Sequence, residues 1–386
     1  MPPRRKRAKT AVSTEGPSPD KLSPKATPYQ ESANANETAL SNDGLNDTGL
    51  LRLPVELFDM IFETLWQSCR DCEDVTREAV LRNFAYLDST YATKQDTLRS
   101  LSQVCRTLRA HFLPLLWEHV YACVVRREGG ASHKILGERL QKLSKGLLKT
   151  PDVAQYVRVF SVSITKYQAS SILATWADCL EILPNLHTVQ IMCASALITT
   201  SLKKTFEDRK FPQIRTIVLP DCAHNFLRAC PEVTEVICNE KDGGKLVTAI
   251  ASSCKKVEVV QDILPEPAIL KRLLRATPRL REYRIDCCGS RHSDPWRDCV
   301  SPDLLRGLSA FNDLAVLSVT ISTEDSDSSP LVHTTEDHVR SAKIALRDTK
   351  LQGPKRLCVN YSFYDRTASR NAPGYWTVIR TETHNV

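Results

Sequence analysis

An apolar residue followed by further apolar residues three and five positions later recurs through most of the chain, and this spacing constrains the fold more than any other sequence feature. The first copy is Val157, Phe160 and Val162. Later copies begin at intervals of 29, 28, 19, 24, 23 and 34 residues, at Leu186, Ile214, Val233, Val257, Leu280 and Leu314, and the copy at Val257 is weaker. The last two positions of a copy alternate as they do on one face of a strand. The pattern therefore predicts a series of short strands.

Helical spacing separates these copies. Apolar residues recur at three- and four-residue intervals around Trp176, around Val247, after Pro267 and after Pro302. A further strand is predicted at Leu357, Val359, Tyr361 and Phe363, which alternate with other residues. Strands that alternate with helices are typical of an α/β fold.

Helix alternating with strand at these intervals resembles a degenerate leucine-rich repeat. In that family the residue eight positions after the first apolar residue is usually Asn or Cys, whose side chain bonds backbone groups in the turn. Cys222 and Cys288 stand there, whereas five copies depart from the pattern with Thr165, Ala194, Lys241, Pro265 and Ser322. The resemblance implies an irregular α/β solenoid over residues 122–386, which would offer a long surface for a protein target. A compact α/β domain is the alternative.

The preceding segment, residues 49–121, has the spacing of amphipathic helices. Pro54 suits a first helical position, and Leu57 and Ile61 lie four residues apart on one face. A second helix is predicted to start after Asp96, a suitable N-cap, and to end at Pro114. Residues 67–95 between the two helices are polar and are predicted to be an insertion.

Three short motifs in this segment resemble the F-box, in the order usual for that family. They are Leu53-Pro54-x-Glu56-Leu57, then Leu101-Ser102-Gln103-Val104-Cys105-Arg106, then Leu115-Leu116-Trp117. The resemblance implies a three-helix module that presents an apolar face to the Skp adaptor of an SCF ubiquitin ligase and, through it, to cullin. The implied Skp contacts are Leu53, Pro54, Leu57, Ile61, Leu101, Val104, Cys105 and Trp117.

Two features depart from the F-box pattern. The insertion at residues 67–95 is longer than the usual connection, and position 108 is Leu where an aromatic residue is common. A long surface loop is tolerated because closure entropy grows only logarithmically with length. The alternative is that these helices are a structural cap on the following domain.

Together the two resemblances imply a non-catalytic, substrate-recruiting F-box subunit of an SCF-type E3 ubiquitin ligase. The alternative is a non-catalytic nuclear leucine-rich-repeat scaffold without a ubiquitin-ligase role. The phosphate-binding, zinc-protease and serine-hydrolase motifs are missing from the sequence, so we expect no catalytic residue and no cofactor. We also expect no metal at Cys287, Cys288, His292 and Cys299, because their spacing fits no usual zinc motif.

Residues 1–48 contain few large apolar side chains and are predicted to be disordered. Five of the cations that give the chain its net charge of +7 lie within the first ten residues, and removing these five leaves +2 for all other residues together; they are Arg4, Arg5, Lys6, Arg7 and Lys9. The nearly neutral body predicts no nucleic-acid partner. The cluster has the composition of a nuclear import signal, with a merely solvating tail as the alternative, so we expect the protein in the nucleus, the cytoplasm or both.

No membrane association is expected from the sequence. The longest stretch without charged residues, 182–202, contains Pro184, Asn185 and His187 and is too polar to span a bilayer. The basic N-terminus has no apolar stretch behind it, so we expect no signal peptide and reduced cysteines.

The import hypothesis makes a direct prediction. Changing Arg4, Arg5, Lys6 and Arg7 to Ala removes most of the cationic cluster and should shift the protein from nucleus to cytoplasm, as measured by fluorescence microscopy of a tagged chain. An unchanged distribution would leave the cluster as a solvating segment.

Overall fold

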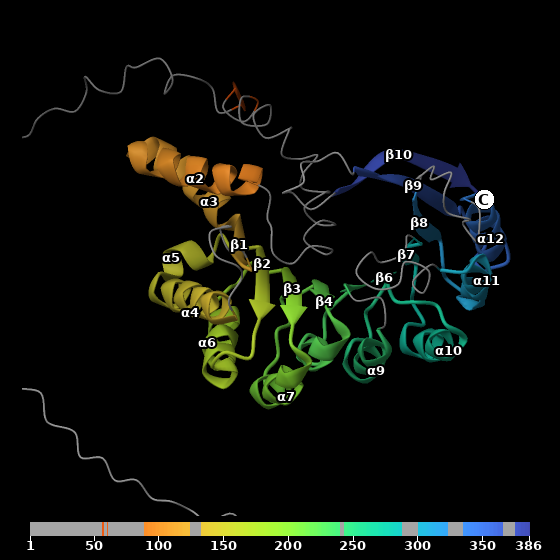
Figure 1. Cartoon of the computed structure of the whole chain (residues 1–386), viewed down its shortest axis with the longest axis horizontal. Helices are drawn as coiled ribbons and strands as arrows, with labels where there is room; N and C mark the ends of the chain where they lie inside the picture. The colour runs from red at the N-terminus through yellow and green to blue at the C-terminus, as the bar shows by residue number, and fades with distance from the viewer. Residues whose placement is uncertain are drawn as a thin grey trace, which may run out of the picture. The chain divides into compact units, whose positions relative to one another are not determined.

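The strands of the protein form a single sheet in which spatial order follows chain order (Figure 1). The computed structural model describes residues 56–57, 60, 89–123, 133–239, 243–287, 300–322, 335–365 and 375–386. All of them belong to one unit, Leu53–Val386. The strands are β1 (His119–Ala122), β2 (Val159–Ile164), β3 (Thr188–Ala194), β4 (Thr216–Leu219), β5 (Glu235–Cys238), β6 (Val259–Gln261), β7 (Glu282–Asp286), β8 (Val316–Ser322), β9 (Arg356–Asp365) and β10 (Tyr375–Asn385). Every pair from β1 to β9 is parallel, and β10 is antiparallel to β9.

The strand pairing aligns the second residue of each sequence copy across the sheet. Phe160 pairs with Val189, and the same register continues through each following strand. We call these fully buried residues the inward row: Phe160, Val189, Ile217, Val236, Val260, Tyr283, Leu317 and Leu357. The predicted α/β class and the strand positions are therefore confirmed.

A repeated backbone contact precedes each strand from β3 to β8. The carbonyl of Arg158 accepts hydrogen bonds from the amides of His187 and Thr188, at 3.0 and 3.1 Å. The carbonyl of His187 does the same for Arg215 and Thr216. The pattern continues at four further carbonyl groups, those of Arg215, Thr234, Glu258 and Arg281. Because each of these carbonyls accepts two donors, the turn into each of these six strands is tied to the turn before it.

Helices connect the parallel strands. The longer ones are α4 (His133–Lys149), α6 (Ala169–Glu181), α7 (Thr199–Phe206), α9 (Gly244–Ser253), α10 (Pro267–Ala276) and α12 (Thr335–Arg347). Short turns of helix complete the connections: α5 (Pro151–Ala154), η3 (Ala196–Ile198), η4 (Asp221–Ala223), α8 (His224–Leu227), α11 (Pro302–Arg306) and η5 (Gly307–Ala310). Right-handed crossovers between consecutive strands place helices on one face of a sheet. In Figure 1, α4, α6, α7, α9 and α10 lie on the same side of β2–β6.

The helices bury their apolar residues against the inward row. α6, α9 and α10 coincide with the helical spacing around Trp176, Val247 and Pro267, so these three predictions are confirmed. The largest buried side chain is Trp176, whose ring stacks on Phe226 with centroids 5.3 Å apart and meets the edge of Phe206 at 5.6 Å. This aromatic cluster joins α6, α7 and α8 in one core.

The prediction of one helix from Asp96 to Pro114 is wrong. α2 (Ser89–Val104) begins inside the predicted insertion, and a second helix, α3 (Arg106–Glu118), follows after a break at Cys105. The Asp96 carboxylate binds Arg99 Nη1 at 2.6 Å within α2. Pro114 lies inside α3, whose later residue Trp117 packs against the core and helps to offset the hydrogen bond that proline cannot make.

Residues 1–48, most of 49–88 and the connections at 124–132, 288–299 and 323–334 lie outside the described residues. The predicted tail and the middle of the predicted insertion are among them. No helix in the part of the chain that the structure describes is long and apolar enough to cross a membrane.

The aromatic cluster predicts a large loss of stability on truncation. Trp176→Ala should lower the free energy of unfolding by about 3–5 kcal/mol, because it removes a fully buried indole and leaves a cavity beside Phe206 and Phe226. Leu197→Ala, at a side chain that is 78% exposed, should cost less than about 0.5 kcal/mol. Urea denaturation of both variants measures the difference, and equal losses would contradict the packing described above.

Candidate partner-binding surfaces

The α2–α3 junction brings together three of the residues expected to contact Skp. Leu101 is half-buried in α2, and Val104, the last residue of that helix, is 67% exposed. Cys105 has extended backbone angles, φ −154° and ψ 171°, and its Sγ accepts a hydrogen bond from the Leu108 amide at 3.5 Å as the N-cap of α3. The cap ends one helix and starts the next, which leaves Val104 at an exposed corner.

The rest of the expected Skp set divides into separate groups. Trp117 packs against the core, and Phe112 of the same helix is fully buried. Leu57 is helical and 38% exposed, and the nearby Met60 is helical and 57% exposed. Leu53, Pro54 and Ile61 lie outside the described residues. Trp117 therefore has a packing role, whereas Leu57 and Val104 are available to a partner.

The face of the sheet away from the inward row carries a second aligned set. We call it the outward row: Ser161, Gln190, Val218, Ile237, Gln261, Arg284, Ser318 and Cys358. Its polar members bond across the strands, for example Ser161 Oγ to Gln190 Oε1 at 2.8 Å. Val218 and Ile237 are buried but do not belong to the main core cluster. Ser161 is fully buried as well, whereas the other five members of the row are partly exposed.

The outward face has a charged centre on β4, β5 and β7. Arg284 binds Glu235 through Nη1 at 2.7 Å and Glu282 through Nε at 2.6 Å, and Thr216 donates a hydrogen bond to Glu235 at 3.0 Å. Burial lowers the pKa of Arg284, but the hydrogen bonds and charges of Glu282 and Glu235 outweigh it and raise that pKa overall. The guanidinium therefore stays charged and holds three strands in register.

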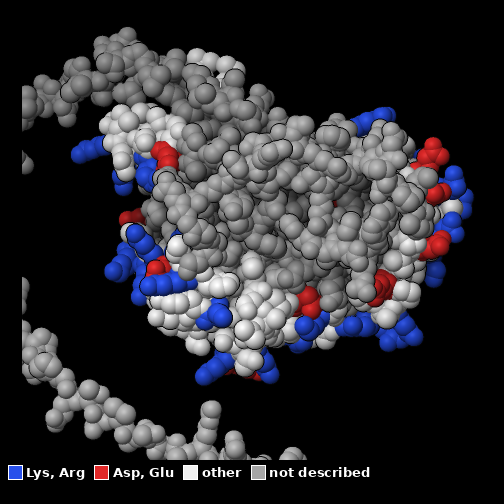
Figure 2. Space-filling model, viewed as in Figure 1, with Lys and Arg blue, Asp and Glu red and all other residues white. Residues whose placement is uncertain are grey.

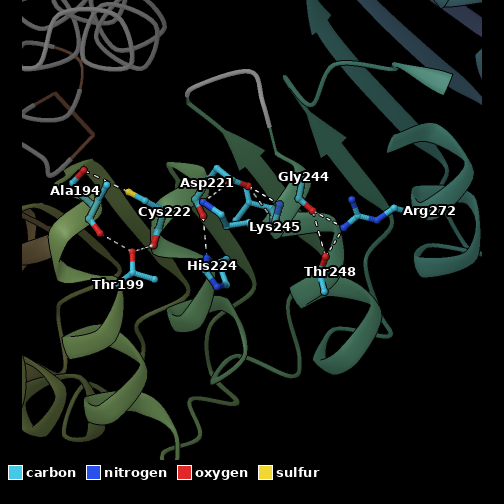
Figure 3. A network of polar contacts seen from close by, with 11 residues as sticks. Ala194, Thr199, Asp221, Cys222, His224, Gly244, Lys245, Thr248 and Arg272 are labelled. Atoms are coloured by element: carbon cyan, nitrogen blue, oxygen red, sulfur yellow. Dashed lines mark hydrogen bonds and ion pairs between the residues drawn. The ribbon is translucent and has the colours of Figure 1, made fainter. Parts of the chain in front are cut away.

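A buried carboxylate ties one strand–helix unit to the next (Figure 3). Asp221 in η4 points toward the start of α9, where its Oδ1 accepts hydrogen bonds from the amides of Lys245 and Leu246 at 2.7 and 3.2 Å. Its Oδ2 lies 3.3 Å from Lys245 Nζ. Asp221 thus caps a helix 24 residues later in the chain.

The side chain that caps α9 comes from a residue distant in the sequence because the residue at the N-cap position is a glycine. Gly243 occupies the N-cap position with φ 69°, and a Cβ placed there would lie 2.8 Å from Ile263 Cγ1. A residue with a capping side chain is excluded by both the backbone conformation and the neighbouring side chain. Two adjacent glycines at a predicted helix start are the signal that could have revealed a missing local cap.

One of the two turn cysteines can be checked in the structure. The Cys222 thiol donates a hydrogen bond to the Ala194 carbonyl of the preceding unit at 3.3 Å, so its predicted bonding to backbone is confirmed. Thr199 Oγ1 donates a hydrogen bond to the carbonyl oxygen of Cys222 at 3.3 Å (Figure 3). Cys288, His292 and Cys299 lie outside the described residues. Within the described ranges, no three His, Cys, Asp or Glu side chains are grouped so that they could hold a metal ion.

Several thiols are buried in the core. Burial raises the pKa of Cys123, Cys179 and Cys254 to about 12, and it raises that of Cys230 well above its usual value. At neutral pH these four groups are thiols and poor nucleophiles. Their role is packing.

No protein-family model and no curated protein matches the chain.

Removing the Asp221 cap makes a local prediction. Asp221→Ala leaves the Lys245 and Leu246 amides without their acceptor and should destabilise α9 by about 1–2 kcal/mol. Hydrogen exchange measured on Asp221→Ala and on the unmodified protein should show that the substitution accelerates the exchange of amides in α9 more than that of amides in α6. Asp303→Ala is the matched control, because the Asp303 side chain is 81% exposed and pairs only with Arg306 at 3.4 Å. Uniform exchange changes in both variants would contradict the capping role.

Proposed function

We propose that this protein is a substrate-recruiting F-box subunit of an SCF-type E3 ubiquitin ligase. In this role the segment 49–121 binds the Skp adaptor and, through it, cullin. The sheet-containing region binds a protein target, which is thereby held close to a charged ubiquitin carrier and raised in effective concentration. The protein itself performs no bond chemistry in this proposal.

Exposed apolar side chains on the N-terminal helices carry the proposal. Nine large apolar residues are exposed within the described ranges. Four of the nine lie on the N-terminal helices, although these helices make up only a small part of the described residues: Leu57, Met60, Val104 and Leu115. Large apolar side chains at 38–67% exposure are unfavourable in water unless a partner covers them. Three of the four, Leu57, Val104 and Leu115, belong to the F-box-like motifs.

We also infer that the sheet and its helices are an irregular leucine-rich-repeat-like solenoid. The sequential strand order, the inward row and the repeated two-donor carbonyl contacts support this interpretation. Its outward face is the proposed surface for the target, with the Arg284 cluster at its centre.

A second candidate is a nuclear repeat scaffold whose N-terminal helices are only a cap. One observation favours it: Trp117 of α3 packs against the core that the strands form. Such a scaffold would be stable and soluble without Skp, whereas an F-box subunit should behave poorly until the adaptor covers its apolar face.

The Skp proposal is tested by co-purification of the full-length chain with Skp. Val104→Asp places a charge at the exposed α2–α3 corner and should reduce recovery of Skp at least about tenfold, because a carboxylate would be buried in the interface. Leu57→Asp should act in the same way.

Leu197→Asp is the matched control, since Leu197 is the most exposed large apolar side chain of the described part and lies in η3, far along the chain from the proposed interface. It should leave Skp recovery unchanged. Failure of the unmodified protein to bind Skp, or equal recovery with all three variants, would favour the scaffold.

A further inference from the structure

The last strand of the sheet has an open edge. β10 pairs with β9 on one side, and no strand of the described chain lies on its other side. It spans 11 residues, whereas β1, the strand at the opposite end of the sheet, spans 4. Short edge strands, Pro and Lys hinder pairing with another chain, and residues 375–385 contain neither Pro nor Lys. β10 is therefore suited to pair with a further strand.

The pairing with β9 shows which backbone groups of β10 point to the open edge. The amide of Val386, one residue beyond β10, donates a hydrogen bond to the Lys355 carbonyl at 3.0 Å and continues the β9–β10 register. Backbone groups alternate in direction along a strand, so every second residue before Val386 points toward β9. The remaining residues direct their N–H and C=O groups to the open edge, and all of them are exposed: Thr381, Thr383 and Asn385.

Charged side chains of both signs lie along one face of β10. Arg380, Glu382 and His384 share the face of the inward row, since His384 pairs with Leu357. Within one chain Arg380 binds Glu382, which also accepts a hydrogen bond from the Tyr361 hydroxyl at 3.1 Å. The Arg380 side chain is 69% exposed and is therefore accessible to a second carboxylate. Figure 2 shows Lys or Arg beside Asp or Glu at the end of the molecule where Figure 1 marks the C-terminus.

This charge pattern selects one register for a second copy of β10. The outward backbone groups of two antiparallel copies meet when the two-fold axis passes through a residue rather than between two residues. An axis at Glu382 places two like charges opposite each other, which is unfavourable. An axis at Thr383 opposes Glu382 to His384. An axis at Thr381 opposes Glu382 to Arg380, whose guanidinium matches the geometry of a carboxylate best.

We propose that the protein forms a two-fold symmetric dimer in which β10 pairs antiparallel with β10 of a second copy, with the axis at Thr381. The Thr381 amide and carbonyl groups of the two copies bond each other, and Arg380 of each copy faces Glu382 of the other. The register shift between Val378 and Arg380 adjoins this segment, so the pairing is short and the dimer is weak. The proposal is independent of Skp binding, because β10 lies outside residues 49–121.

Sedimentation velocity of the full-length chain tests the proposal. The unmodified protein should shift from monomer to dimer as its concentration is raised about a hundredfold. Arg380→Glu and Glu382→Arg each turn two attractions into repulsions and should raise the dimer dissociation constant at least about tenfold. An equal mixture of these two variants should dimerise again, because the two acidic positions of one chain then face the two basic positions of the other.

Thr381→Pro tests the backbone contact separately from the charges. Proline removes an amide hydrogen that points away from β9, so the β9–β10 pair keeps its hydrogen bonds. The substitution should raise the dimer dissociation constant at least about tenfold, because the central hydrogen bonds of the pairing are lost. A dimer as strong as that of the parent chain would contradict the proposed edge contact.

The control changes an ion pair elsewhere on the surface. Arg306→Glu disrupts the exposed pair with Asp303 in α11 and leaves β10 untouched, so it should change the dissociation constant less than about twofold. Melting temperatures of all variants verify that the fold is retained. A parent chain that stays monomeric, single charge variants that dimerise like the parent, or a mixture of the two that stays monomeric would overturn the proposal.

Discussion

Parallel pairing of each strand with the next strand in the chain is the interaction on which the rest of the structure depends. It aligns the inward row, from Phe160 to Leu357, so that the helices that connect the parallel strands pack on the same apolar surface. It also brings each turn within reach of the one before, as in the contact of the Arg158 carbonyl with two later amides. With helices confined to one face, the other face keeps its hydrogen-bonding side chains, including Arg284 and its two carboxylate partners.

The sequence predicted those elements whose buried positions are apolar. The strands β2 to β9 and the helices α6, α9, α10 and α11 were found because their core residues are large aliphatic or aromatic side chains, whereas β1 and β10 were not predicted. α12 was missed because its buried positions are His338, Ser341, Ala342, Ala345 and Leu346, which give almost no apolar periodicity. α4 was missed although Leu136, Leu140 and Leu147 are buried at helical spacing, because Gly137 and Ser144 share that face. The break at Cys105 was missed because a cysteine N-cap is indistinguishable by spacing from a helix interior.

The candidate surfaces were predictable only where they depend on a local motif. Val104 and Leu57 are exposed, as a partner contact requires, and Cys222 bonds backbone as its turn position implied. Trp117 is engaged by the core instead. Asp221 and the Arg284 cluster join residues 24 and 49 positions apart, and their roles emerge only when the register of distant strands is known.

The sequential strand order also limits how far any local change can spread. Within the described residues, the side-chain hydrogen bonds join a strand–helix unit to its neighbour or, as with Arg284 and Glu235, to the second unit along. Each strand pairs only with the strands that precede and follow it in the sheet order, which is also the chain order, so the contact order is low. A unit can therefore lengthen or shorten without resetting the register of the others. The sequence copies are accordingly separated by intervals that range from 19 to 34 residues, although the sheet that they form is continuous.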